Sequence, residues 1–228
     1  MKVIILAGGK GTRLPLSAKN IPKPLVTVHE KTILDYHIDI LKSFGFSDIR
    51  LSLGHMADKI IDHVKKRYGN FCEWIVEPEK LGTGGALKYA SSDLKKDFLA
   101  FNVDDFPEID MLDFVESHIN RNIENTIAIY KVENAQDFGL IKHRCGYVEE
   151  FLEKPETSVP GYINTGFYIL NPSIFKEISE SSFSIEKDVF PVLAKTRRLA
   201  CYSNVRHWFT TGTEERLAEA HEYLKRYL

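Results

Sequence analysis

Short apolar runs alternate with helix-like patterns along the first half of the chain. A continuous apolar run such as Val3–Ala7 is typical of a buried strand. The pattern predicts strands at Val3–Ala7, Ile49–Leu53, Trp74–Glu77 and Phe98–Asn102, and helices at Thr32–Phe44, Asp58–Tyr68 and Gly84–Ser92. Strands that alternate with helices in this way predict a mostly parallel sheet with helices on both faces.

The helix over Thr32–Phe44 carries signals at both of its ends. Thr32 is a suitable cap, Asp35 stands where a capping box places an acid, and Gly45 is suited to end the helix. We therefore expect the boundaries of this helix to be well defined.

The pattern changes after about Asn125. Strands at Thr126–Lys131, Tyr147–Glu153 and Tyr162–Leu170 follow with few helices between them, which indicates antiparallel additions, and a helix from about Thr213 to Leu228 closes the chain. No linker, repeat or low-complexity stretch interrupts the pattern. We predict one α/β domain over residues 1–228, with three Rossmann-like layers and a central mixed, mostly parallel sheet.

Composition narrows the class of protein. The 228 residues are 43% hydrophobic and 27% charged, and 30 basic against 32 acidic residues give a net charge of -2. This balance favours a globular protein and argues against a general nucleic-acid or membrane-surface binder. The chain has neither an apolar run long enough to span a membrane nor a recognisable signal peptide, and its three cysteines are scattered. We therefore expect free thiols and a cytoplasmic location.

A glycine-rich turn directly follows the first strand, with the sequence Gly8-Gly9-Lys10-Gly11-Thr12-Arg13-Leu14. Such a turn lets backbone N–H groups approach phosphates. Leu14 stands where a dinucleotide fingerprint has its third glycine, and no Gly-Lys-Ser/Thr ending forms a P-loop. By itself the turn is equally compatible with a surface loop. A second signal is Lys23, which Pro22 and Pro24 hold in a stiff segment.

Together these motifs resemble the signature of the sugar-1-phosphate nucleotidyltransferases, and most closely the heptose/mannose 1-phosphate guanylyltransferase branch. Further pieces follow in the family's order: Glu77, Leu81-Gly82-Thr83-Gly84-Gly85-Ala86, Asn102-Val103-Asp104, Glu153-Lys154-Pro155, Asn164-Thr165-Gly166 and Glu186-Lys187-Asp188-Val189-Phe190. Each piece is weak alone, but the joint order is specific and covers nearly the whole chain. The resemblance implies the nucleotidyltransferase fold and transfer of a nucleoside monophosphate from an NTP to a sugar 1-phosphate.

The resemblance also implies roles for individual residues. Arg13 is expected to bind the leaving phosphates and Lys23 the α-phosphate, and Lys154 the sugar phosphate. The nucleotide-binding set is Leu6, Ala7, Gly8, Gly9, Gly11, Thr12, Glu77, Gly82 and Thr83, and the sugar-phosphate set is Gly139, Glu153, Lys154 and Asn164. Glu77 favours GTP, because one carboxylate can accept both N1–H and N2–H of guanine.

A magnesium ion is the expected cofactor, since Mg²⁺ binds carboxylate and phosphate oxygens. Asp104, just past a predicted strand, is the expected ligand. The chain departs from the family at two positions: Thr210 stands where relatives carry a second metal-binding Asp, and Val103 replaces a glycine. Thr210 implies that Asp104, water and phosphates suffice to hold the metal, that metal binding is weaker, or that catalysis has been lost.

Three alternatives stay open. The first is a uridylyl-, thymidylyl- or cytidylyltransferase of the same family, and the second is a non-catalytic relative that binds nucleotide-sugars. The third is a dinucleotide-dependent oxidoreductase, against which the motifs above argue. The expected partners are an NTP and a sugar 1-phosphate, without nucleic acid or membrane, and self-association is left open.

Overall fold

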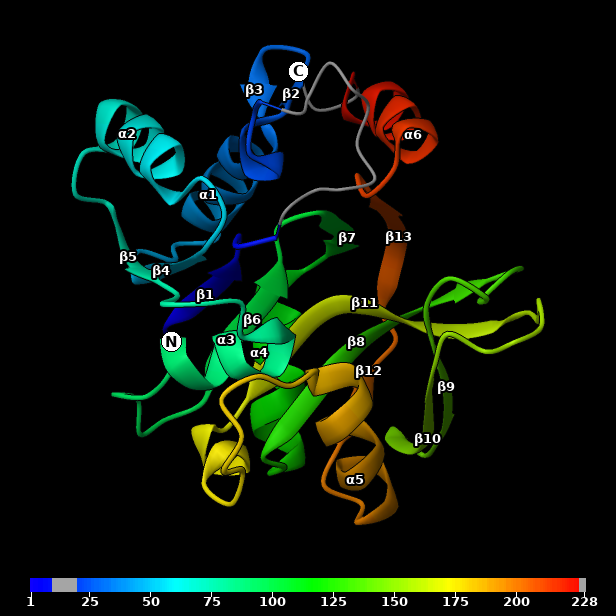
Figure 1. The fold of residues 1–228 in the computed structure, drawn as a ribbon. Coiled ribbons are helices and arrows are strands. Elements are labelled where there is room, and N and C mark those ends of the chain that lie inside the picture. The colour runs from blue at the N-terminus through cyan, green and yellow to red at the C-terminus, as the bar shows by residue number, and fades with distance from the viewer. Residues whose placement is uncertain (10–19, 226–228) are drawn as a thin grey trace.

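The computed structural model describes residues 1–9 and 20–225. Nine strands form one sheet, in the order β5 (Cys72–Val76), β4 (Ile49–Leu53), β1 (Val3–Leu6), β6 (Phe98–Asn102), β11 (Gly161–Leu170), β8 (Asn125–Val132), β12 (Ala200–Tyr202), β10 (Tyr147–Glu153) and β9 (Gly139–Arg144). Figure 1 shows β5 and β4 on one side of the molecule and β9 and β10 on the other, with the remaining strands of the sheet between them.

The prediction of a mostly parallel sheet is wrong. Parallel pairing joins β5, β4, β1 and β6, and again β8 and β12. Antiparallel pairing joins β6 to β11, β11 to β8 and to β9, and β10 to β12 and to β9. The reason lies in the connections, because antiparallel neighbours such as β9 and β10 can be joined by a tight turn, whereas parallel strands require a crossover. The parallel part is confined to the region where helices alternate with strands.

Helices cover both faces of the sheet. Successive residues of a strand point to opposite faces, and in β1 Val3 and Ile5 belong to one buried cluster while Ile4 belongs to the other. The first cluster includes α1 (Ile33–Ser43), α2 (Ala57–Tyr68), α4 (Met111–Arg121) and α6 (Glu214–Leu224), and the second includes α3 (Gly82–Ala90) and α5 (Phe190–Lys195). Figure 1 shows α1 and α2 on the opposite side of β1 from α3. Among the described helices, none combines the length and apolar character that a membrane span requires.

The capping signals of α1 are confirmed. The Asp35 N–H donates to Thr32 Oγ1 and the Thr32 N–H donates to Asp35 Oδ2, each at 3.1 Å. Gly45 follows the helix with a φ of +82°, a left-handed conformation that glycine adopts without a steric penalty. Local sequence therefore determines both ends of α1.

Several short elements were not anticipated from the sequence. They are the strands β9 and β12, the helices α4 and α5, and β2 (Thr27–Val28), β3 (Lys31–Thr32), β7 (Asp105–Ile109), β13 (Val205–Thr210), the 3-10 helices η2 (Lys23–Leu25) and η3 (Pro172–Phe175), and the π-helix η4 (Ile185–Val189). The strand β7 contains Pro107, a residue found in strands only at edges, and it pairs antiparallel with β13 outside the main sheet. This ribbon places Asp105 opposite Thr210.

A buried histidine joins α1 to the strand end that carries Asp104. His37 is 3% exposed, its Nε2–H donates to the Val103 carbonyl oxygen at 2.9 Å, and its ring stacks on Phe106. Burial lowers the pKa of His37 to about 4, because the charged imidazolium would lose its hydration. Val103, the departure from the family's glycine, is itself packed in the core at 4% exposure.

The stability of the protein should therefore fall as the medium becomes acidic. The unfolded chain binds a proton at His37 near pH 6.5 and the folded chain only near pH 4, so acid favours unfolding across this interval by about 3 kcal/mol. Denaturant titrations at a series of pH values measure this loss, and in His37→Phe, which keeps the ring packing, the free energy of unfolding should decline less steeply with acid. An identical pH slope in the variant would contradict the assignment.

Candidate active site

A cavity of about 550 Å³ lies at the carboxyl ends of β1 and β6. Ligand sites in open α/β sheets gather at such strand ends. The cavity is lined by Leu6, Ala7, Gly8, Gly9, Lys23, Pro24, Gly54, His55, Glu77, Glu79, Lys80, Gly82, Thr83, Ala86, Asn102, Val103, Asp104 and Gly212. Every described residue of the predicted nucleotide-binding set is among them, together with Lys23 and Asp104. Gly11, Thr12 and Arg13 lie outside the described residues.

The end of β1 passes very close to two neighbours. A Cβ atom on Gly8 would lie 2.7 Å from Glu77 Oε1 and 3.1 Å from the Gly54 nitrogen. The Gly8 carbonyl oxygen also accepts a hydrogen bond from the His55 N–H at 3.2 Å. A larger residue at position 8 would therefore displace the cavity wall.

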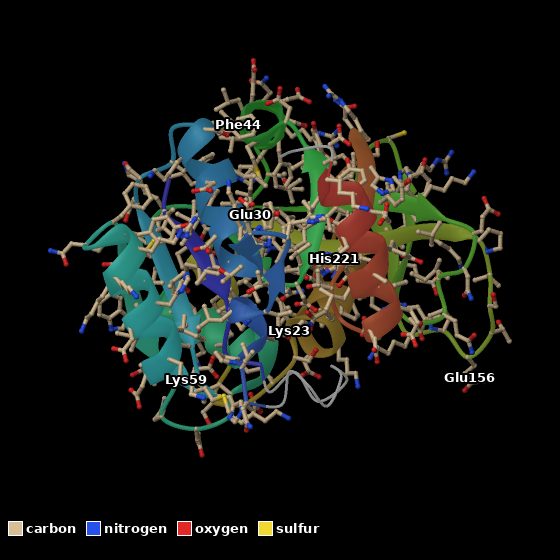
Figure 2. The ribbon with its side chains drawn as sticks, turned by 90° about the horizontal axis from the view of Figure 1, so that it is seen from above. Lys23, Glu30, Phe44, Lys59, Glu156 and His221 are labelled. Carbon is tan, nitrogen blue, oxygen red and sulfur yellow. The ribbon has the colours of Figure 1, made fainter. Side chains whose placement is uncertain are left out.

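Lys23 enters the cavity from the first turn after Pro22. Pro22 has an extended conformation before η2, and Pro24 is buried within it. The Lys23 ammonium donates to Asp104 Oδ2 as part of an ion pair in which the side chains are 11% and 27% exposed. Figure 2 shows Lys23 near the middle of the molecule in that view. An ammonium group has three donors, so two remain for a ligand.

Glu77 follows β5 and lies at another wall of the cavity. Its two carboxylate oxygens make long hydrogen bonds, at 3.3 Å from Ser52 Oγ and 3.4 Å from the Leu81 N–H. Burial raises the pKa of the Glu77 carboxyl, an effect that these hydrogen bonds oppose. A carboxylate with such weak partners retains capacity to accept hydrogen bonds from a ligand.

Thr210, which is buried, and Asp105, which is partly buried, form a pair on the β7–β13 ribbon next to Asp104. The Thr210 hydroxyl donates to the Asp105 carboxylate, which also accepts from Asn102 Nδ2 at 3.1 Å. Burial and the negative charge of Asp104 raise the pKa of Asp105. A Cβ on Gly212 would lie 3.6 Å from both Asp104 Oδ2 and Thr210 Oγ1, so these two oxygens border the same small space.

The acidic groups at this site are too few to hold a metal ion by themselves. Among residues 1–9 and 20–225 there is no group of three or more His, Cys, Asp or Glu side chains suited to a metal. Asp104 supplies one carboxylate at the cavity and Thr210 a neutral oxygen near it. This donor set fits Mg²⁺, which is commonly bound by one or two carboxylates together with substrate phosphates and water.

The predicted sugar-phosphate residues lie outside the cavity lining, but three of them lie on the neighbouring strands β9, β10 and β11. Gly139 pairs with Glu153 across β9 and β10, and a Cβ on Gly139 would lie 3.1 Å from Glu153 Oε2. Asn164 Nδ2 donates to the Tyr168 hydroxyl at 2.9 Å. Burial raises the pKa of Glu153, and the charge of Glu186 raises it further.

Lys154 differs from these residues because it is exposed. It adopts a φ of +52°, and its N–H donates to the Phe138 carbonyl oxygen at 3.0 Å. Glu156, two residues further, lies at the edge of the molecule in Figure 2, well away from Lys23. Lys154 therefore belongs to an open loop and not to the lining of the cavity.

Two acids were missed as candidates. Glu186 occurs in a motif for which the sequence suggested no role, yet its carboxylate contacts Thr83 in the cavity wall. Asp105 was not among the candidates either, but its carboxylate accepts a hydrogen bond from Thr210. Neither position follows from local sequence, because each depends on segments about 100 residues apart in the chain.

Comparisons with known proteins agree on one family. The family model described as "Nucleotidyl transferase" matches residues 2–226. The mannose-1-phosphate guanyltransferase of Gibberella zeae is 37% identical over 224 residues, covering 93% of this chain and 61% of that protein. The mannose-1-phosphate guanyltransferase of Candida albicans is 35% identical over the same shares. The chain thus spans about three fifths of the length of these curated relatives.

Solved structures give the same result for the fold. HddC from Yersinia pseudotuberculosis, crystallised with GMP-PN, superimposes with a TM-score of 0.85 at 32% identity, covering 98% of this chain and 99% of that one. A putative glucose-1-phosphate thymidylyltransferase from Bacillus anthracis superimposes with a TM-score of 0.87 at 24% identity, covering 98% and 94%, and supports the fold alone.

Proposed function

Since this chain belongs to the nucleotidyl transferase family, we propose that it transfers a nucleoside monophosphate from an NTP to a sugar 1-phosphate. The products are an NDP-sugar and pyrophosphate. The observation that supports this most directly is the cavity at the ends of β1 and β6, which Lys23 and Asp104 line together with Gly8 and Gly9. We assign the activity to a single cytoplasmic domain over residues 1–228, with a three-layer, Rossmann-like arrangement.

In the proposed reaction an oxygen of the sugar phosphate attacks the α-phosphorus of the NTP. A new P–O bond forms as the bond to the bridging oxygen of the β-phosphate breaks, and pyrophosphate leaves with that electron pair. Such transfers depend on positioning and charge neutralisation more than on a covalent nucleophile. The chain needs cations aimed at the phosphates, and it does not need a catalytic Ser or Cys.

Four charged residues are proposed to bind the phosphates and the metal ion in this transfer. Lys23 binds the α-phosphate with the two N–H groups that Asp104 leaves free, Arg13 binds the leaving phosphates, and Lys154 binds the sugar phosphate from its loop. Asp104 would hold Mg²⁺, with phosphate oxygens and water as the other ligands. When bound, the ion neutralises the negative charge that builds up between the two substrates.

The preferred nucleotide is proposed to be GTP. Glu77 has weakly bonded oxygens at the cavity wall, and guanine presents two adjacent N–H donors to one carboxylate. The guanine nucleotide bound to HddC and the names of the fungal relatives support the same choice. The sugar is proposed to be mannose 1-phosphate or a closely related sugar phosphate.

A panel of five NTPs against several sugar 1-phosphates, read as released pyrophosphate, tests this function. We expect turnover with GTP and mannose 1-phosphate to exceed that with UTP or dTTP. Absence of pyrophosphate with every pair, at any metal concentration, would instead support the non-catalytic nucleotide-sugar-binding alternative. Better use of UTP or dTTP than of GTP would contradict the proposed nucleotide.

Glu77→Gln should weaken the use of GTP. One amide oxygen cannot replace two carboxylate oxygens, and a hydrogen bond to a charged group contributes about 1.5–3 kcal/mol, or about 10- to 100-fold in KM. Steady-state kinetics with GTP and UTP measure the change, which should be larger for GTP. Glu79→Gln, an exposed acid of the same cavity, is the matched control. Equal losses for both nucleotides would contradict a base-reading role.

A further inference from the structure

The segment that precedes η4 packs unusually closely against the start of α3. A Cβ on Gly85 would lie 2.1 Å from the Ser181 carbonyl oxygen, and one on Gly84 would lie 2.2 Å from the Phe183 ring. The Gly84 N–H also donates to the Phe183 carbonyl oxygen at 3.0 Å. Because these glycines lack side chains, a segment that is distant in the sequence can pack directly on them. That segment leads directly into Glu186.

Glu186 holds the cavity residue Thr83 through one of its two carboxylate oxygens. Oε2 accepts hydrogen bonds from Thr83 Oγ1 at 2.5 Å and from Ser184 Oγ at 2.7 Å. The Ile185 N–H donates to Thr83 Oγ1 at 3.1 Å, so the threonine hydroxyl is fixed from both sides. The other oxygen of Glu186, Oε1, makes no hydrogen bond to any residue that the structure describes.

Glu186 also lies beside the predicted sugar-phosphate residues, because η4, which carries it, packs against β10, the strand that ends at Glu153. Its charge raises the pKa of Glu153 and of Tyr168, after burial, which is the larger cause for each. Tyr168 is the hydrogen-bond partner of Asn164. Within the described part of the chain, Glu186 thus lies between a nucleotide-cavity residue and the group formed by Gly139, Glu153 and Asn164. It stands in a π-helix, a distortion that often marks functional sites.

The chemistry of this group suits a polyhydroxylated ring. Sugar hydroxyls are neutral donors, and ionised carboxylates are pure acceptors. Two acids side by side are unfavourable without such donors, and among the described residues only the positive charges of Lys154 and Lys187 act on Glu153 against this repulsion. A ring whose hydroxyls donate to both acids would satisfy oxygens that the protein leaves free.

We propose that Glu186 is a sugar-specificity residue that accepts a hydroxyl of the sugar 1-phosphate through Oε1 while Oε2 holds Thr83 at the nucleotide cavity. This inference rests on the proposed function. It predicts that the two substrate sites share one carboxylate, so that a change at Glu186 affects sugar recognition more strongly than nucleotide recognition.

The test compares Glu186→Gln with Thr83→Val and with Glu177→Gln, an exposed acid of the preceding segment. With mannose 1-phosphate and GTP as probes, Glu186→Gln should raise the KM for the sugar phosphate by about tenfold or more and the KM for GTP by about threefold or less. Thr83→Val should affect GTP at least as much as the sugar, and Glu177→Gln should resemble the wild type.

Monodeoxy analogues of mannose 1-phosphate identify the hydroxyl. For the analogue that lacks the contacted group, wild type and Glu186→Gln should have similar KM values, because the hydrogen bond is absent from both. If Glu186→Gln only reproduces the Thr83→Val pattern, or leaves the KM for the sugar unchanged, the inference is overturned while the proposed function stands. If wild type turns over no sugar 1-phosphate, the proposed function fails and the inference fails with it.

Discussion

Lys23→Ala should lower kcat by about 10²–10³-fold while the protein stays folded. Groups that are aimed at developing charge in a buried site contribute about 3–4 kcal/mol to the transition state. Lys23 meets this description, because its ammonium is mostly buried at the cavity and oriented by Asp104. Single-turnover and steady-state pyrophosphate release measure the loss, and a similar loss is expected for Arg13→Ala.

The control for Lys23→Ala is Lys31→Ala. Lys31 also pairs with an aspartate, Asp39, at 2.8 Å, but that ion pair is more exposed and lies outside the cavity lining. Its removal should cost less than about 1 kcal/mol of stability and leave turnover near normal. Turnover of Lys23→Ala within about threefold of wild type would remove Lys23 from the active site. Loss of the thermal unfolding transition would show that the ion pair is structural.

The position of the cavity could be predicted because it depends on local patterns. The apolar runs that become β1 and β6 end at Gly8 and Asp104, and strand ends on one edge of a parallel sheet lie close together. Glu77 follows the same rule after β5, which pairs parallel with β4. For such residues, a correct strand assignment already determines the neighbourhood of the side chain.

Residues placed by non-local packing could not be predicted in the same way. The contact between Thr83 and Glu186 depends on an approach that is permitted by missing Cβ atoms at Gly84 and Gly85. The sequence shows those glycines, but it does not show which segment fills the space above them. The pairing of Asp105 with Thr210 likewise depends on the ribbon of β7 and β13, whose proline-containing strand does not resemble one in the sequence.

The antiparallel half of the sheet was misjudged for a related reason. The alternation of strands and helices up to β6 favours parallel pairing, and it is correct for β1, β4, β5 and β6. The strand that follows β6 in the sheet is β11, which returns from the second half of the chain in the opposite direction. Periodicity reports which residues are buried, but it does not report the direction of a distant partner strand.

Asp104→Ala should nearly abolish turnover, and wild type should require an elevated Mg²⁺ concentration. Asp104 provides the only predicted carboxylate ligand, because Thr210 supplies a neutral oxygen where relatives have an acid. Hard cations gain most from charged oxygens, so the ion here depends more on substrate phosphates. A Mg²⁺ titration of pyrophosphate release measures the requirement. Binding of Mn²⁺ followed by electron paramagnetic resonance, with GTP present, gives a readout that does not depend on turnover.

Restoring the second acid should lower the metal requirement, but only if Asp105 is changed with it. The Thr210 hydroxyl donates to the partly buried Asp105 carboxylate, so Thr210→Asp alone would place two carboxylates against each other where little water reaches them. Like charges so placed destabilise the protein and keep one acid protonated. The double variant Thr210→Asp/Asp105→Asn avoids this repulsion, because an amide can donate to the new acid.

We therefore expect the double variant to reach half-maximal turnover at a lower Mg²⁺ concentration than either wild type or Thr210→Asp, and to bind Mn²⁺ more tightly. Asp105→Asn alone should leave the metal requirement near that of wild type, because Asp105 faces Asn102 and Thr210 and does not line the cavity. If Asp105→Asn strongly raised the Mg²⁺ concentration needed for turnover, Asp105 would be the second metal-binding acid of this chain. It would then replace the acid that relatives carry at position 210, on the opposite strand of the β7–β13 ribbon. A wild type without turnover at every metal concentration, together with an active double variant, would mean that the natural chain binds nucleotide-sugars and does not make them.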